Sequence, residues 1–105
     1  MGGRSAKIKG SRVEREVVQL FKDNGNKAER IDARRGQFGA TKSHDVDVYV
    51  AGRPAPYCGE VKARKAIPKF WRDALGDNDF LVVKEDRQDP FFILPEQVFL
   101  ELIKK

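Results

Sequence analysis

Hydrophobic positions recur with helical spacing in the first quarter of the chain. The i, i+4, i+7, i+8 spacing that marks one face of an amphipathic helix is occupied by Val13, Val17, Leu20 and Phe21. We therefore predict a helix that begins at Ser11 and ends at Asn24-Gly25, a pair typical of helix ends. Residues 1–10 are basic and contain glycine, and we expect them to form a flexible tail.

Two later segments have the alternating pattern of a β-hairpin. Polar and apolar residues alternate over residues 45–50, which predicts a strand with one face on the core. Residues 52–56 are typical of a turn, and residues 57–64 are expected to return as an antiparallel strand. A weaker strand is predicted over residues 27–34. Residues 35–43 contain two glycines without periodicity, as in a loop.

The last third of the chain predicts a helix, two strands and a further helix. Residues 67–75 form the first of these, with Pro68 in its first turn, and the apolar runs 80–83 and 91–94 are expected to be buried strands. Pro95 opens a terminal helix whose apolar side carries Val98, Phe99, Leu102 and Ile103. The order predicts an α/β fold, a central mixed β-sheet flanked by helices, in one domain over residues 11–105.

Size and composition limit the class of protein. The chain has 105 residues, which fits one domain, and 40% hydrophobic with 35% charged residues is typical of soluble globular proteins. No apolar run approaches the roughly 18 residues that span a membrane, and residues 1–10 lack the apolar core of a secretory signal. One cysteine excludes an internal disulfide and a zinc site built from cysteines. We expect a cytoplasmic protein with no membrane partner.

Positive charge is concentrated in the first part of the chain. Residues 1–42 hold 11 Lys or Arg and 5 Asp or Glu, a net of +6, whereas residues 43–105 hold 10 and 11, a net of −1. Clustered cations favour a polyanionic partner such as DNA, because binding releases counterions from phosphates. A well-solvated basic surface is the alternative.

The hairpin brings acidic and basic side chains to one face. Because strand side chains alternate, Asp47 on the first strand and Glu60 and Lys62 on the second are expected to converge. Adjacent carboxylates repel each other, and a bound Mg²⁺ with water and phosphate oxygens relieves this repulsion. A lysine beside them positions the attacking water and offsets charge on the phosphate. An ordinary exposed charge ladder is the competing interpretation.

Glu14 is the candidate acid of the first helix. At about 100° per residue it lies at the margin of the apolar arc, where a carboxylate needs a partner. In the functional interpretation, Glu14 faces the Asp47 and Glu60 patch and binds a metal-bound water or a second ion. The alternative is a capping box, Ser11-x-x-Glu14, in which Glu14 satisfies a backbone N–H.

Three motifs in order resemble a known nuclease superfamily. They are Gly10-Ser11-Arg12-Val13-Glu14-Arg15-Glu16, Val46-Asp47-Val48 with Ala51-Gly52, and Glu60-Val61-Lys62. Over roughly residues 9–64 the chain is similar to the PD-(D/E)xK superfamily. It most resembles the archaeal-type Holliday junction resolvases, including viral and plasmid forms. The resemblance implies a restriction-endonuclease-like α/β core.

The same resemblance implies the roles of the site residues. Asp47 and Glu60 would be metal ligands assisted by the carbonyl of Val61, Lys62 the catalytic lysine, and Glu14 the acid of the first helix. Mg²⁺ would be the cofactor, with Mn²⁺ substituting. Such resolvases are homodimers that place two symmetric nicks in a four-way DNA junction during recombination and repair, in the host cytoplasm where a virus encodes them.

Several residues carry alternative interpretations. No proline precedes Asp47, and Asp45 is a rival ligand. His44 is either a phosphate contact or a bystander, and Cys58 is expected to serve in packing. The expected DNA contacts are Arg15, Arg34, Arg35, Lys42 and Arg64, with Phe38 stacking or wedging at a distorted base step.

Junction specificity is a narrower hypothesis than nuclease activity. A nicking or mismatch-type endonuclease with the same fold, or a DNA-binding protein without turnover, would share these motifs. A homodimer is expected to use the Phe70-Trp71 region, which is otherwise core, or residues 91–94.

Overall fold

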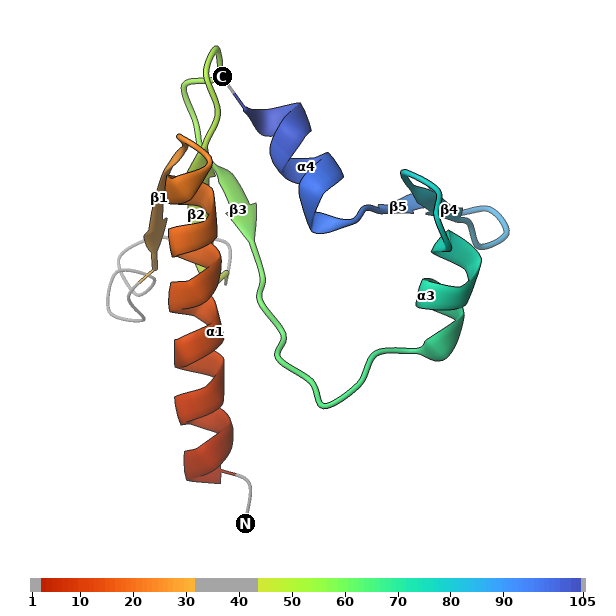
Figure 1. The fold of residues 1–105 in the computed structure, drawn as a ribbon, viewed down its shortest axis with the longest axis horizontal. Coiled ribbons are helices and arrows are strands. Elements are labelled where there is room, and N and C mark those ends of the chain that lie inside the picture. The colour runs from red at the N-terminus through yellow and green to blue at the C-terminus, as the bar shows by residue number, and fades with distance from the viewer. Residues whose placement is uncertain (1–2, 32–43, 105) are drawn as a thin grey trace. The chain divides into compact units, whose positions relative to one another are not determined.

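The chain has a mixed α/β structure in the expected order of elements. The computed structural model describes residues 3–31 and 44–104. Its elements are α1 (Gly3–Asp23), β1 (Lys27–Arg30), β2 (Val46–Tyr49), β3 (Tyr57–Gly59), α3 (Lys69–Leu75), β4 (Leu81–Val83), β5 (Phe91–Ile93) and α4 (Glu96–Ile103) (Figure 1). Residues 1–63 and 103–105 form one compact unit, and residues 64–102 form another.

Helix α1 is longer than the apolar spacing predicts. It begins at Gly3, so the expected start at Ser11 is wrong. Gly10 and the polar residues around it interrupt the apolar pattern, but a helix tolerates an interior glycine for about 1 kcal/mol. The expected end is confirmed: the amide of Asn24 donates to Leu20, and Gly25 takes a positive φ of 92°.

The first unit contains a three-stranded antiparallel sheet in the order β1-β2-β3. The β2–β3 hairpin is confirmed, and its register places Asp47 opposite Cys58. Its turn is closed by a 3.1 Å bond from the amide of Arg53 to the carbonyl of Val50, with Gly52 at φ 88°, as a type II turn requires. Helix α1 contacts β1 and β2. The core consists of Val18, Phe21, Ala28, Val46, Val48 and Ile103.

Strand β3 is shorter than predicted. It ends at Gly59 rather than at residue 64, so Glu60 and Lys62 follow the strand. A regular ladder would place Glu60 opposite Asp45. Instead the amide of Asp45 donates to the carbonyl of Gly59, and the amide of Val61 donates to the Asp45 side chain. A side-chain acceptor thus replaces the backbone partner, and the ladder stops.

The expected central sheet of mixed strand direction is wrong. The second unit has its own antiparallel pair, β4 and β5, and every strand pair in the described ranges 3–31 and 44–104 is antiparallel. The two strands are not buried either: Phe91 is 78% exposed and Phe92 60%, with Phe92 tilted against Phe80 at 6.0 Å. A two-stranded sheet contacted by α3 offers little area in which to bury them.

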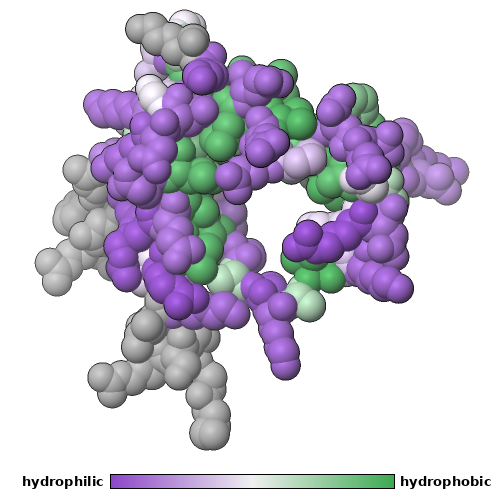
Figure 2. Space-filling model, viewed as in Figure 1, coloured by the Kyte–Doolittle hydropathy of each residue, from purple (hydrophilic) through white to green (hydrophobic). Residues whose placement is uncertain are grey.

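Exposed hydrophobic residues also occur on the helices of the second unit. Phe70 is exposed and Trp71 partly so, and on α4 Phe99 and Leu102 are exposed although the terminal stripe was expected to be core. Ile103, which belongs to the first unit, is buried. Hydrophobic residues are visible at the surface of the first unit, beside α1, and at the surface of the second unit (Figure 2). Of the helices described, none has the length and apolar character needed to cross a membrane.

Asn26 joins three segments of the first unit. Its side-chain amide donates to the carbonyls of Tyr49, at 3.2 Å, and Ile103, at 3.0 Å, and its oxygen accepts from Asn24 at 2.8 Å. The residue is buried, so these bonds replace water that the polar group would otherwise need. Asn26 therefore fixes the end of β2 and the last residue of α4 relative to the turn after α1.

Candidate functional site

Asp47 is the most buried acid of the expected site. It lies in the middle of β2, and its side chain is only 12% exposed. Its Oδ1 lies 2.7 Å from Nε2 of His44, which is itself largely buried. The other ring nitrogen of His44, Nδ1, is buried without a hydrogen-bond partner among the described residues. Asp47 and His44 therefore form one buried polar pair at the start of β2.

Cys58 completes a group of three possible metal ligands. It is exposed, so the expectation that it serves in packing is wrong. The ligand atoms of His44, Asp47 and Cys58 all lie within 4.8 Å of one another. The register of the hairpin puts Asp47 opposite Cys58, but its centre lies one position beyond that of the tight turn from Val50 to Arg53. The turn alone would therefore not have predicted this pairing.

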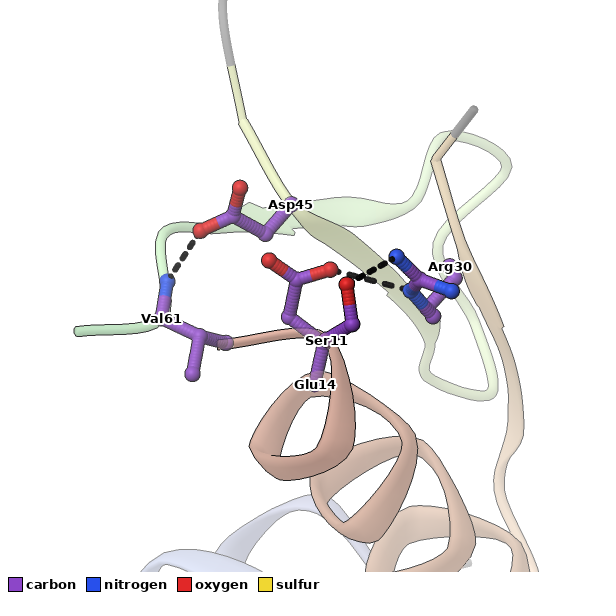
Figure 3. A network of polar contacts seen from close by, with 5 residues as sticks. All are labelled: Ser11, Glu14, Arg30, Asp45 and Val61. Carbon is purple, nitrogen blue, oxygen red and sulfur yellow. Dashed lines mark hydrogen bonds and ion pairs between the residues drawn. The ribbon is translucent and has the colours of Figure 1, made fainter. Parts of the chain in front are cut away.

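Asp45 holds the segment that follows β3. Its Oδ2 accepts a 2.6 Å hydrogen bond from the amide of Val61 (Figure 3). The bond fixes the centre of Glu60-Val61-Lys62 beside the start of β2. Asp45, a rival ligand in the sequence, acts in this structure as an anchor for the motif.

Glu60 and Lys62 form an exposed ion pair. Lys62 Nζ lies 3.2 Å from Glu60 Oε2, and the two side chains are 61% and 49% exposed. Such a pair contributes about 0–1 kcal/mol, because water screens it and two long side chains must be ordered. The pair therefore breaks at little cost when either side chain finds a stronger partner.

Glu14 binds a side chain rather than a helix end. Its Oε1 accepts a 2.9 Å bond from Nε of Arg30, and Arg30 also donates to the hydroxyl of Ser11 at 3.3 Å (Figure 3). Ser11 lies inside α1, so the capping-box interpretation is wrong. The neighbouring Val18 is buried, which places Glu14 within the buried arc of the helix rather than at its margin. Arg30 stabilises that carboxylate.

The structure gathers the expected site residues into four separate contacts. Asp47 pairs with His44, Asp45 with Val61, Glu60 with Lys62, and Glu14 with Arg30. Glu60 does not belong to the three-residue ligand group around Asp47. Arg15 is exposed on α1, and Arg64 is exposed beyond the motif. The remaining expected DNA contacts lie outside the described residues: Arg34, Arg35, Phe38 and Lys42.

The candidate metal ligands are of two kinds. The carboxylates of Asp47 and Glu60 and the carbonyl of Val61 are hard oxygen donors of the kind that Mg²⁺ prefers. The nitrogen of His44 and the sulfur of Cys58 suit softer ions. The oxygen set has the donor chemistry that Mg²⁺ prefers, but among the described residues it is His44 and Cys58, not Glu60, whose ligand atoms lie close to Asp47.

Comparisons of the chain with protein-family models, with curated proteins and with solved structures found no match.

Proposed function

We propose that this protein is a Mg²⁺-dependent, structure-selective DNA endonuclease of the Holliday junction resolvase type, built on a restriction-endonuclease-like core. One observation carries the proposal. The bond from Val61 to Asp45 anchors Glu60-Val61-Lys62 beside the strand that carries the buried Asp47. The sequence resemblance to PD-(D/E)xK nucleases assigns catalysis to these same residues.

Each side chain has a role that follows from its position. Asp47 and Glu60, with the carbonyl of Val61, would hold the ion. Mg²⁺ would neutralise phosphate charge and lower the pKa of a bound water. Lys62 is exposed and weakly paired, so its ammonium is available to a phosphate oxygen, where it would offset the charge of the transition state.

DNA would bind through phosphate contacts from the basic part of the chain. Arg15 on the exposed side of α1 and Arg64 beyond the motif are the described candidates. Both flank the segments that carry Glu14 and Lys62. These contacts would fix the position of a strand without reading its sequence, because phosphates carry no base information.

A cleavage assay on defined substrates tests the proposal. Labelled four-way junction, Y-fork, duplex and single strand are incubated with the protein, with and without Mg²⁺. Asp47→Asn, Glu60→Gln and Lys62→Ala should each abolish cleavage while DNA binding persists. Lys65→Ala and Asp73→Asn change exposed charges outside the motif and should cleave like the unchanged protein. Cleavage within threefold of wild type in any of the three site variants would overturn the assignment.

A DNA-binding protein of the same fold without turnover is the second candidate. The observation that favours it is that each acid of the site already has a protein partner: His44 for Asp47, Lys62 for Glu60 and Arg30 for Glu14. A binder would show equal junction affinity with and without Mg²⁺ and no cleavage on any substrate. An endonuclease with another DNA target would cut in Mg²⁺ without preferring the junction.

Junction resolution adds the requirement of two active sites. Two symmetric nicks are most simply supplied by a homodimer with C₂ symmetry, because one chain of this size carries one site. Exposed aromatic residues of the second unit offer apolar area for such a contact: Phe70, Phe80, Phe91 and Phe92. Sedimentation at micromolar concentration should give a dimer mass. A monomer on DNA that cuts duplex as readily as junction would remove the resolvase assignment and leave the nuclease.

A further inference from the structure

We propose that His44, Asp47 and Cys58 form a binding site for a thiophilic divalent cation, of which Zn²⁺ is the natural example. Their ligand atoms lie within 4.8 Å of one another. Binding at this site rests on the three side chains alone and does not require the protein to be a nuclease.

The donor set selects the class of metal. Imidazole nitrogen, carboxylate oxygen and thiolate sulfur together suit Zn²⁺ and Co²⁺, whereas Mg²⁺ takes oxygen ligands almost exclusively. With metal–ligand distances of about 2.0–2.3 Å, the ligand atoms of a tetrahedral ion lie about 3.3–3.8 Å apart. His44 and Asp47 begin at 2.7 Å, so a small side-chain rotation places an ion between them. Three protein ligands leave a fourth position to water.

The backbone gives the three ligands a common support. Asp47 and Cys58 are register partners on β2 and β3. His44 lies two residues before the first residue of β2. Partners in an antiparallel pair point to the same face of the sheet. Cys58 is exposed, so an ion reaches the group from solvent, while Asp47 and His44 provide the buried side of the site.

The contacts of His44 distinguish a metal site from a cysteine nucleophile. A nucleophilic thiol needs a hydrogen bond to the imidazole that activates it. Nε2 of His44 faces Asp47, and Nδ1 is buried with no hydrogen-bond partner in the described part of the chain. Cys58 is therefore not bonded to the free ring nitrogen. The ligand atoms of the three side chains instead lie within 4.8 Å of one another, close enough for one ion to bind all three.

Binding exchanges a proton for the ion. The S–H bond of Cys58 breaks, a sulfur–metal bond forms and the proton passes to solvent. The proton that Nε2 of His44 shares with Asp47 moves to Nδ1, so that the ring stays neutral and Nε2 binds the ion. The hydrogen bond between His44 and Asp47 is replaced by two bonds to the metal. Since Asp47 is also the proposed Mg²⁺ ligand, Zn²⁺ at this site would inhibit cleavage if the proposed function holds.

Cobalt titration tests the site directly. Co²⁺ is added to the full chain in a non-thiol reductant, and the thiolate-to-cobalt absorption band is followed. We expect one equivalent to bind, excess Zn²⁺ to remove the band, and excess Mg²⁺ to leave it. Cys58→Ser should abolish the band, and His44→Ala and Asp47→Asn should each weaken Zn²⁺ binding at least tenfold in calorimetry.

Glu60→Gln is the matched control, because it alters the proposed Mg²⁺ site but not these three ligands. It should lose cleavage and keep the cobalt band, so the failure of one proposal is distinguishable from the failure of the other. Circular dichroism confirms that each variant folds, and His44→Gln replaces His44→Ala if the latter does not. Absence of the band in the unchanged protein, or Zn²⁺ affinity unaltered by the His44 and Asp47 changes, would overturn the proposal.

Discussion

Replacing Asp45 by alanine removes the only side-chain acceptor that the described structure gives to the amide of Val61. A hydrogen bond to a charged group contributes about 1.5–3 kcal/mol, and the partly exposed position of Asp45 favours the lower end. A loss of about 1.5 kcal/mol corresponds to a fall in Tm of about 6–12 °C for a domain of this size. The loss of this anchor should also lower the cleavage rate about tenfold, because Glu60-Val61-Lys62 is no longer held in place. About 1.4 kcal/mol of activation free energy corresponds to one order of magnitude in rate.

Asparagine at the same position separates anchoring from metal binding. Its carbonyl oxygen still accepts from Val61, so Asp45→Asn should keep most of the stability and most of the cleavage rate. If Asp45 were a metal ligand, the amide would be a poor substitute and Asp45→Asn would be as inactive as Asp45→Ala. Thermal melting and nicking rate are measured on one preparation of each variant. Equal loss of cleavage in both variants would show that Asp45 acts on the reaction as a ligand rather than as an anchor. An unchanged Tm in Asp45→Ala would refute the anchoring role itself.

Three other perturbations test separate parts of the first unit. Glu14→Gln should lower the free energy of unfolding by at most about 1 kcal/mol, because the ion-pair partner Arg30 is 40% exposed. If Glu14 acts in the site, the same change should lower the cleavage rate at least tenfold. An equal loss of cleavage in Arg30→Gln would show that only the ion pair matters. Asn26→Ala and Asn26→Asp each remove the donor to the carbonyls of Tyr49 and Ile103. Each change should lower the free energy of unfolding, measured in urea, by about 1–3 kcal/mol. A change under about 0.5 kcal/mol would contradict the role of Asn26 in joining these segments. The affinity for the junction should fall steeply as salt is added, because several phosphates are neutralised together. Neutralising Arg34, Arg35 and Lys42 together should flatten this salt dependence. An unchanged dependence would mean that the DNA binds to another surface.

The order of elements was predictable because each has a local signature. The apolar spacing from Val13 to Phe21 identified α1, and Asn24-Gly25 identified its end, since a left-handed glycine stops a helix whatever packs around it. The alternation over residues 45–50 identified β2 in the same way. The register is not determined by the turn alone, because a ladder closed directly by the turn from Val50 to Arg53 would pair Asp47 with Pro56, whereas its partner is Cys58.

The remaining features depend on contacts between distant residues. Alternation continues past Gly59, but β3 ends there, where the amide of Val61 donates to the side chain of Asp45, 16 residues earlier in the sequence. Glu14 appeared to cap a helix because its partner Arg30 follows 16 residues later. Cys58 appeared isolated because His44 lies 14 positions before it. The motif residues could therefore be identified from the sequence, whereas the residues that bond to them in the structure could not.

The hydrogen bond from Asn26 to Ile103 gives the first unit a late step in its assembly. The two residues are 77 positions apart, so α1 and the first strands leave the ribosome long before the carbonyl of Ile103 exists. At about 5–20 residues per second, the delay is about 4–15 s. During this interval the buried amide of Asn26 must be solvated or paired elsewhere. Closing so long a loop also carries an entropic cost that rises with its length. The N-terminal helix and sheet thus reach their final hydrogen bonding only after Ile103 has been added to the chain.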